Sequence, residues 1–116
     1  MKTEKEKMLA GELYIATDPE LAAMRRRARL LIKKLNDSND EQEDLRREIL
    51  KELIGQGGEG LWIEPPFYCD YGSNIAVGDK VFFNFNCVVL DVMPVTIGSV
   101  IIFWSCLEIY TATHPM

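Results

Sequence analysis

The stretch that decides the fold runs from Val77 to His114. Divided into blocks of six residues, it reads VGDKVF-FNFNCV-VLDVMP-VT-IGSVII-FWSCLE-IYTATH, with the pair Val95-Thr96 outside the blocks. The fifth position of the blocks is mostly apolar, and a period of six matches neither a helix nor a plain alternating strand. It predicts a repeat of one short strand and one turn. The first position of every block is apolar: Val77, Phe83, Val89, Ile97, Phe103 and Ile109.

Three such blocks would complete one triangular coil. With coils stacked at the usual spacing between strands, about 4.8 Å, the first-position side chains would form buried columns. The pattern predicts a left-handed parallel β-helix, although its handedness comes from the known hexapeptide-repeat folds and not from the period. About three coils fit between Gly60 and Met116. So short a solenoid needs a cap or a partner at its ends.

The first 55 residues have helical periodicity instead. We predict a short helix within residues 4–14. A second helix should begin at Asp18, whose carboxylate can accept from free backbone N–H groups, with Pro19 at the first helical position. This helix should end at Asn36-Asp37, where its apolar stripe stops.

A third helix should begin at Ser38, which is spaced from Glu41 as in a capping box. Gly55 is a natural residue to end it. The two longer helices predict an antiparallel hairpin, or a pair of helices that lies on something larger. The chain as a whole is predicted to be an α+β protein, with a helical domain over residues 1–57 and a short left-handed β-helix over residues 58–116.

Composition narrows the classes of function. The net charge is −5, with 47% apolar and 27% charged residues, so neither nucleic acid nor an anionic membrane is the expected partner. No apolar run approaches the roughly 20 residues of a membrane-spanning helix, and the N-terminus has no export signal, which predicts a cytoplasmic protein. The three cysteines, Cys69, Cys87 and Cys106, form no C-x-x-C pair. They predict free thiols, with no zinc site or disulfide.

The basic run RRRAR, which spans residues 25–29, has two interpretations. It could bind phosphate. The favoured interpretation is a solvated helix face, paired with the acidic DEQED at residues 40–44.

Three segments carry a family resemblance: EKEKMLAGELY…DPEL, IEPPFYCDYGSNIAVGDKVFFNFNCVVLDV and IYTATHP. Together they resemble the maltose and galactoside O-acetyltransferases of the hexapeptide-repeat superfamily over nearly the whole chain. The resemblance implies acetyl transfer from acetyl-CoA to a sugar hydroxyl. A neutral hydroxyl needs a base with a pKa near the working pH, and the resemblance implies that His114 is this base. The mechanism requires no acyl-enzyme and no metal.

The same resemblance implies three further site residues. Asn84 matches an asparagine near the acceptor, but it could also occupy a left-handed turn position. Asp70 matches a position that lines the sugar site, but it could be a turn residue. Asp91 matches the LDV stretch and is a weaker candidate for substrate binding. No residue matches a segment that binds the cofactor, so the acetyl-CoA-binding residues are unknown.

The chain departs from the family in two places. Relatives continue for several more coils after the THP segment, which makes this chain resemble a shortened member. In addition, Val100 stands where the family has a turn residue that tolerates positive φ, and Trp104 begins a second replaced turn. The run SVIIFW would then be apolar at a solvated corner, which is typical of a protein–protein contact.

Two functions follow from these observations. The first is a sugar O-acetyltransferase that works as a homotrimer or larger homo-oligomer. The alternative is a catalytically inactive scaffold that assembles through the apolar segment 100–107.

Overall fold

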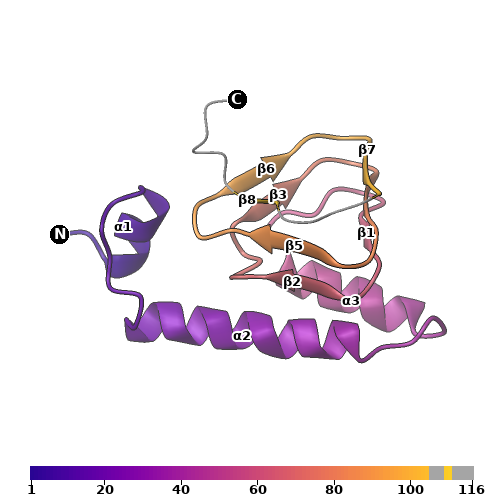
Figure 1. Ribbon diagram of the computed structural model, residues 1–116, viewed down its shortest axis with the longest axis horizontal. Helices are drawn as coiled ribbons and strands as arrows, with labels where there is room; N and C mark the ends of the chain where they lie inside the picture. The colour runs from indigo at the N-terminus through magenta and orange to yellow at the C-terminus, as the bar shows by residue number, and fades with distance from the viewer. Residues whose placement is uncertain (105–108, 111–116) are drawn as a thin grey trace.

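The computed structural model describes residues 1–104 and 109–110 of the chain. It contains three helices, α1 (Glu4–Leu9), α2 (Pro19–Asn36) and α3 (Glu43–Leu53). Figure 1 shows α2 and α3 along one end of a stack of strands, with α1 to one side. The strands are β1 (Trp62–Ile63), β2 (Phe67–Cys69), β3 (Ile75–Val77), β4 (Val81–Phe83), β5 (Cys87–Leu90), β6 (Val95–Ile97), β7 (Ile101–Phe103) and β8 (Ile109–Tyr110).

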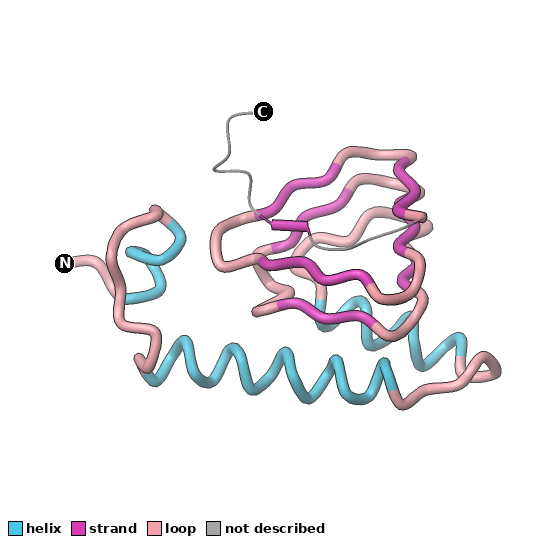
Figure 2. Tube along the Cα trace, in the orientation of Figure 1, coloured by secondary structure: helices cyan, strands magenta, loops and turns pink. Residues whose placement is uncertain are grey.

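Every strand pair is parallel, and consecutive strands belong to different sheets in rotation. The sheets have the orders β1-β4-β7, β2-β5-β8 and β3-β6. Phe67 pairs with Cys87, and Val81 pairs with Ile101, so each strand faces the strand twenty residues further along. Figure 2 shows the resulting coils of strand and turn stacked on one another. The predicted combination of helices with repeated short parallel strands is confirmed.

Each coil has twenty residues, which is two more than three blocks of six. These two extra residues do not lie at Val95-Thr96, where the sequence predicts them. Val95 is paired with Ile75 within the ladder between β3 and β6. The longer turn is instead residues 91–94, between β5 and β6. Its counterpart one coil earlier is the turn 70–74. The ladder decides the position, because Val95 must stay opposite Ile75 for β6 to continue the sheet.

A twenty-residue repeat begins earlier than the blocks at Val77 suggest. Residues 58–63, 78–83 and 98–103 read GEGLWI, GDKVFF and GSVIIF. Each copy bonds to the next at the same corner: the Glu59 N–H donates to Asp79 Oδ1 at 2.9 Å, and the Asp79 N–H donates to Ser99 Oγ at 2.9 Å. The third residue of each copy has positive φ, 76° at Gly60, 56° at Lys80 and 57° at Val100. The predicted β-branched residue at a positive-φ turn position is therefore confirmed at Val100.

The core of the coil consists of inward-facing strand residues. Val81, Phe83 and Val89 are at most 1% exposed, and the Phe83 and Phe103 rings stack with centroids 4.8 Å apart. The predicted burial of the first block positions is confirmed at Val77, Phe83, Val89 and Ile97, whereas Phe103 is partly buried. The side chain of Ile109 lies outside the described residues.

Helices α2 and α3 share this core with the strands. Leu31 and Leu35 of α2, and Ile49 and Leu53 of α3, belong to the same hydrophobic cluster as Phe67 and Val81. The two helices form the predicted hairpin, which lies on the first coil (Figure 1). The predicted start of α2 is also confirmed, because Asp18 Oδ2 accepts from the N–H groups of Glu20 and Leu21 at 3.0 and 3.3 Å.

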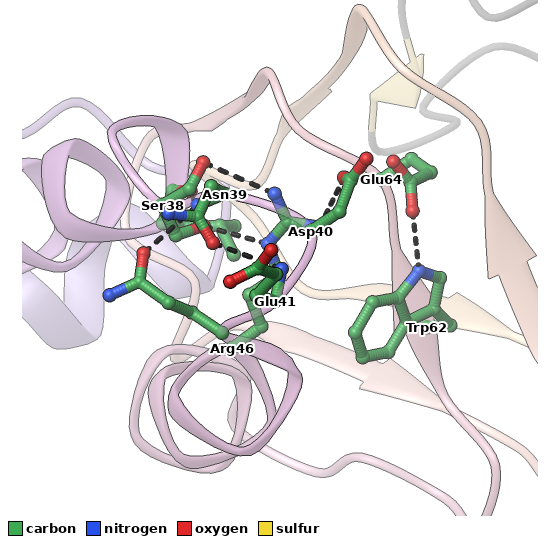
Figure 3. A network of polar contacts seen from close by, with 9 residues as sticks. Ser38, Asn39, Asp40, Glu41, Arg46, Trp62 and Glu64 are labelled. Carbon is green, nitrogen blue, oxygen red and sulfur yellow. Dashed lines mark hydrogen bonds and ion pairs between the residues drawn. The ribbon is translucent and has the colours of Figure 1, made fainter.

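The predicted capping box of the third helix is wrong. Helix α3 begins at Glu43, and its N-cap Gln42 makes no side-chain cap bond. The Ser38 hydroxyl instead accepts from the buried Arg46 Nε at 2.7 Å and donates to the Leu35 carbonyl. Arg46 also donates to the Ser38 carbonyl at 3.1 Å (Figure 3). A guanidinium eight residues away thus competes for the hydroxyl that the sequence assigned to the helix start.

Gly55 has a different role from the predicted helix end. The C-cap of α3 is Ile54, which has an extended backbone conformation. A Cβ at Gly55 would lie 2.2 Å from the Ser73 carbonyl oxygen. The Gly55 N–H donates to the Gly72 carbonyl at 3.0 Å. Glycine is therefore needed here because the chain passes so close to the turn 70–74.

Candidate functional site

The best-defined polar cluster lies where the turn 70–74 meets the turn one coil later. Asp91 is fully buried there. Its Oδ1 accepts from the N–H groups of Asp70 and Tyr71 at 3.0 and 2.9 Å, and its Oδ2 accepts from the Asn74 N–H at 3.2 Å. The Asn74 side-chain amide donates in return to the Asp91 carbonyl at 2.8 Å. One carboxylate therefore holds most of the backbone of the turn.

Helix α3 supports the same turn from below. Gly72 has a φ of 75°, and a Cβ there would lie 2.3 Å from the Leu53 carbonyl oxygen. Tyr71 is 2% exposed and packs with Met8 and Leu21. Both halves of the chain therefore fix the position of this turn.

Asp70 is the partly exposed carboxyl group of the cluster. Among the residues that the structure describes, its Oδ2 is buried without a hydrogen-bond partner. Burial raises the pKa of Asp70 above its ordinary value, and the nearby charge of Asp91 raises it further, against the opposing effect of Arg25 and Arg29. Burial also raises the pKa of Asp91, against the backbone N–H bonds that favour its charged form.

The basic run on α2 contributes to this corner. The Arg25 guanidinium donates to the Tyr71 hydroxyl at 3.1 Å and to the Ala16 carbonyl at 2.7 Å. Arg27 donates to the Glu52 carbonyl. In the described part of the chain, no ion pair joins RRRAR to the acidic DEQED segment. Two of the four arginines are therefore bonded to uncharged oxygens of the fold.

Asn84 lies on the next corner of the coil, between β4 and β5. Its Nδ2 donates to the Trp104 carbonyl at 3.3 Å, and its Oδ1 accepts from the Phe85 N–H at 2.9 Å. The left-handed position of this turn is Asn86, with a φ of 66°, so that alternative for Asn84 is wrong. Within residues 1–104, no hydrogen bond joins Asn84 to Asp70 or Asp91.

The structure thus brings Asp70 and Asp91 together and places Asn84 on a separate corner. His114 and Cys106 lie outside the described residues. Neither Cys69 nor Cys87 forms a disulfide within the described part of the chain. Sequence reasoning missed Arg25, Tyr71 and Asn74 as residues of the corner that contains Asp70 and Asp91, which we call the acidic corner. The YGSN turn signal after Asp70 could have indicated Asn74, but the contact with Arg25 spans 46 residues and has no local signal.

Two further observations concern metal ligands and membrane spans among the described residues. No group of three or more His, Cys, Asp or Glu side chains is arranged there to hold a metal ion. None of the helices that the structure describes is both long and apolar enough to cross a bilayer.

A groove of about 400 Å³ lies between α2 and β2. It is lined by Arg29, Tyr68 and Cys69, and Cys69 directly precedes Asp70 in the chain.

Comparison with known proteins defines the class. Residues 7–58 match the maltose acetyltransferase hexapeptide capping motif. The chain is similar to Nodulation protein L of Rhizobium meliloti (strain 1021), with 46% identity over 114 residues, which are 98% of this chain and 62% of that relative. The chain therefore spans less than two thirds of the length of this relative.

Solved structures indicate the same class of protein. A maltose O-acetyltransferase from Clostridium difficile 630 superposes with a TM-score of 0.92 and 38% identity, over 99% of this chain and 62% of that chain. A hexapeptide-repeat acetyltransferase from Vibrio cholerae O1 biovar eltor, complexed with acetyl coenzyme A, gives a TM-score of 0.79 and 38% identity over 88% of this chain and 55% of that chain. The fold and the capping motif are those of the hexapeptide-repeat acetyltransferases. Within this class, the homologues of the chain include maltose and galactoside O-acetyltransferases.

Proposed function

We propose that the protein is a sugar O-acetyltransferase that moves an acetyl group from acetyl-CoA to a hydroxyl of a sugar such as maltose, glucose or a galactoside. The observation that carries the proposal is the superposition of 99% of the chain on a maltose O-acetyltransferase. The acetyl-CoA complex of a second similar structure supports the donor. The relatives are acetyltransferases, so the inactive-scaffold alternative is not favoured.

In the proposed reaction, His114 is the general base. Its imidazole takes the proton of the sugar hydroxyl as the hydroxyl oxygen attacks the thioester carbonyl carbon. The tetrahedral intermediate then collapses, the carbon–sulfur bond breaks, and the imidazolium returns the proton to the leaving thiolate. The products are an acetylated sugar and free coenzyme A. This role for His114 rests on the similarity of the IYTATHP segment to the family.

The other three residues have separate roles in this proposal. Asn84 helps to orient the acceptor near the reacting carbonyl. Asp70 accepts a hydrogen bond from a sugar hydroxyl, which its unpartnered Oδ2 supports. Asp91 is the weaker candidate for substrate binding, because it is completely buried and bonds to the N–H of Asp70.

The proposal includes the finer features of the architecture. The coil is a left-handed β-helix over residues 58–116, and residues 1–57 form its capping domain. The proposed location is the cytoplasm, in keeping with Cys69 and Cys87, which form no disulfide among the described residues.

A homotrimer or larger homo-oligomer is the proposed assembly. The outer face of the sheet β1-β4-β7 presents Trp62, Phe82 and Ile102 in register. Trp104 extends this face, with its ring centroid 6.5 Å from that of Phe82 and 72% of its surface exposed. Exposed apolar surface of this kind is typical of protein–protein contacts.

The reaction is tested by release of coenzyme A. The protein is incubated with acetyl-CoA, a thiol-reactive dye and maltose, glucose or a galactoside. We expect thiol release that requires the sugar and is lost in His114→Ala. A matched sample without acetyl-CoA corrects for dye that reacts with the cysteines of the protein.

Two results would contradict the proposal. Absence of sugar-dependent release with every acceptor would exclude this activity. Release that persists in His114→Ala would exclude His114 as the base.

A further inference from the structure

Asp91 is the least expected residue of the acidic corner. A fully buried carboxylate is rare, because removing a charge from water is costly unless hydrogen bonds compensate. Three backbone N–H groups compensate it here, from Asp70, Tyr71 and Asn74. All three belong to one turn, and Asp91 reaches them from the following coil. Its bonding capacity is therefore directed inward, at the turn, and not at solvent.

Asp70 presents the opposite situation. Its backbone N–H is held by Asp91 at 3.0 Å. Its side-chain Oδ2 has no partner among residues 1–104 and 109–110. Leaving a buried acceptor unpaired costs about 1–3 kcal/mol. The fold thus fixes the main chain of Asp70 and leaves its carboxyl group with unused bonding capacity.

A simpler role for Asp91 would be to hold the turn alone. An asparagine or serine could accept one or two of these N–H bonds without burying a charge. A carboxylate adds a negative charge beside Asp70, and that charge acts on the second carboxyl group through space. The positive charges of Arg25 and Arg29 on α2 oppose this effect, and the Cys69 thiol precedes Asp70 in the chain.

We propose that Asp91 is the positioning residue of the sugar-binding turn. Its carboxylate fixes the backbone of residues 70–74 and so holds the Asp70 carboxyl group, whose Oδ2 has no hydrogen-bond partner among the described residues, in position for a sugar hydroxyl. The inference rests on the proposed function for the sugar. It adds that Asp91 acts through Asp70 and does not touch the substrate.

The arrangement has a consequence for pH. A hydroxyl that donates to Asp70 stabilises the ionised carboxylate, so bound sugar lowers the pKa of Asp70. Sugar affinity should therefore rise with pH across the interval between the pKa of the bound state and the pKa of the free state. The negative charge of Asp91 raises the pKa of Asp70, which moves that interval to higher pH.

The experiment follows the carboxyl carbon of Asp70 by NMR during a pH titration, with and without maltose. In the wild type we expect a midpoint above that of an ordinary aspartate and a downward shift on adding maltose. Asp91→Asn should lower the midpoint of the free protein and weaken maltose binding at least tenfold. The matched control is Asn74→Ala, which breaks a bond of the same turn and keeps both carboxylates. It should leave the midpoint of Asp70 unchanged.

A wild-type measurement keeps the test decisive if Asp91→Asn fails to fold. The amide protons of Asp70 and Tyr71 bond to the same carboxylate oxygen, so their chemical shifts should follow one common titration. Independent titration of the two amides would overturn the inference. So would an ordinary Asp70 midpoint that is insensitive to Asp91→Asn, or wild-type maltose affinity in that variant. If maltose changes no signal, the proposed function fails, and the titrations alone then decide whether Asp91 controls Asp70.

Discussion

The side chain of Asn36 bonds twice to the backbone of Phe67. Its Nδ2 donates to the Phe67 carbonyl at 3.0 Å, and its Oδ1 accepts from the Phe67 N–H at 2.9 Å. The last residue of α2 thus satisfies the free edge of β2 in the way that another strand would. Phe67 is fully buried, so both of its backbone groups depend on this amide.

Asn36→Ala should therefore destabilise the protein. It leaves two buried backbone groups unpaired, and we expect a loss of roughly 1–3 kcal/mol in the free energy of unfolding. Urea denaturation measures the loss. Lys34→Ala, at an exposed position of the same helix, is the control and should change little. Equal stability of the two variants would show that water replaces the amide.

Val100 offers a stabilising substitution. Its φ of 57° places a β-branched residue in the left-handed region, which costs about 1–2 kcal/mol in L-residues. Val100→Asn should recover roughly 1 kcal/mol, because asparagine tolerates this conformation. Val100→Thr keeps the branched Cβ and serves as the control. A thermal unfolding midpoint that rises in both variants would point to lower surface hydrophobicity as the cause.

Arg46 and Arg47 are neighbours in the chain, but their substitutions should cost different amounts of stability. Arg46 is buried and bonds to the Ser38 hydroxyl and carbonyl. Arg46→Met should cost about 2 kcal/mol, since bonds to a charged group contribute about 1.5–3 kcal/mol. Arg47 is exposed and pairs with Glu43 at 2.6 Å, so Arg47→Met should cost at most about 1 kcal/mol. Denaturation midpoints measure both, and a larger cost at Arg47 would refute the assigned role of Arg46.

Asp70→Asn should stabilise the protein at neutral pH. Burial and the Asp91 charge raise the pKa of Asp70 in the folded state, so the folded state binds a proton more tightly than the unfolded state. Stability from this group is present at low pH and is lost as pH rises through the folded pKa. The variant cannot ionise and should exceed the wild type at pH 7.

The control for this prediction is the stability of Asp70→Asn relative to the wild type near pH 3. The advantage of Asp70→Asn should disappear below the ordinary aspartate pKa of about 3.9, where wild-type Asp70 is protonated in both states. Free energies of unfolding at the two pH values measure the difference. A variant that is less stable than the wild type at pH 7 would show that the carboxylate has a bonding partner.

The apolar outer face of the sheet β1-β4-β7 predicts an effect on assembly. Trp104 is 72% exposed at its edge. Trp104→Ser should reduce the mass measured by light scattering if this face joins subunits. Tyr68→Ser removes an exposed aromatic ring from a different sheet and should leave the mass unchanged. A monomeric wild type would contradict the proposed assembly itself.

Several elements were predictable because their signals are local. The six-residue period identified the inward positions Phe83 and Val89, and Asp18 with Pro19 marked the start of α2. Ser38 failed as a cap because a buried arginine from the next helix takes its hydroxyl. Neither residue type nor spacing near Ser38 reports that competition.

The site was less predictable than the fold. Asp70 and Asp91 were both candidates, but their different roles depend on burial and on bonds that cross between coils. The position of the two extra residues also depends on the pairing of Val95 with Ile75. A period measured along the chain does not contain this information. The spacing of twenty residues between GEGLWI and GDKVFF does contain this information, and it would have placed the first coil correctly.

The glycines at the corners of the coil have a consequence for how such a chain can change in length. A Cβ at Gly58 would lie 2.1 Å from the Gly78 carbonyl oxygen, and a Cβ at Gly78 would lie 2.3 Å from Ser99 Oγ. Successive turns therefore pack so closely that one coil cannot shift relative to the next. Duplication of one twenty-residue unit would preserve every one of these contacts, whereas insertion of a single residue into a strand would exchange its inner and outer faces. Molecules of this type can thus gain or lose length in whole coils of twenty residues, because only such a change keeps every contact between neighbouring coils.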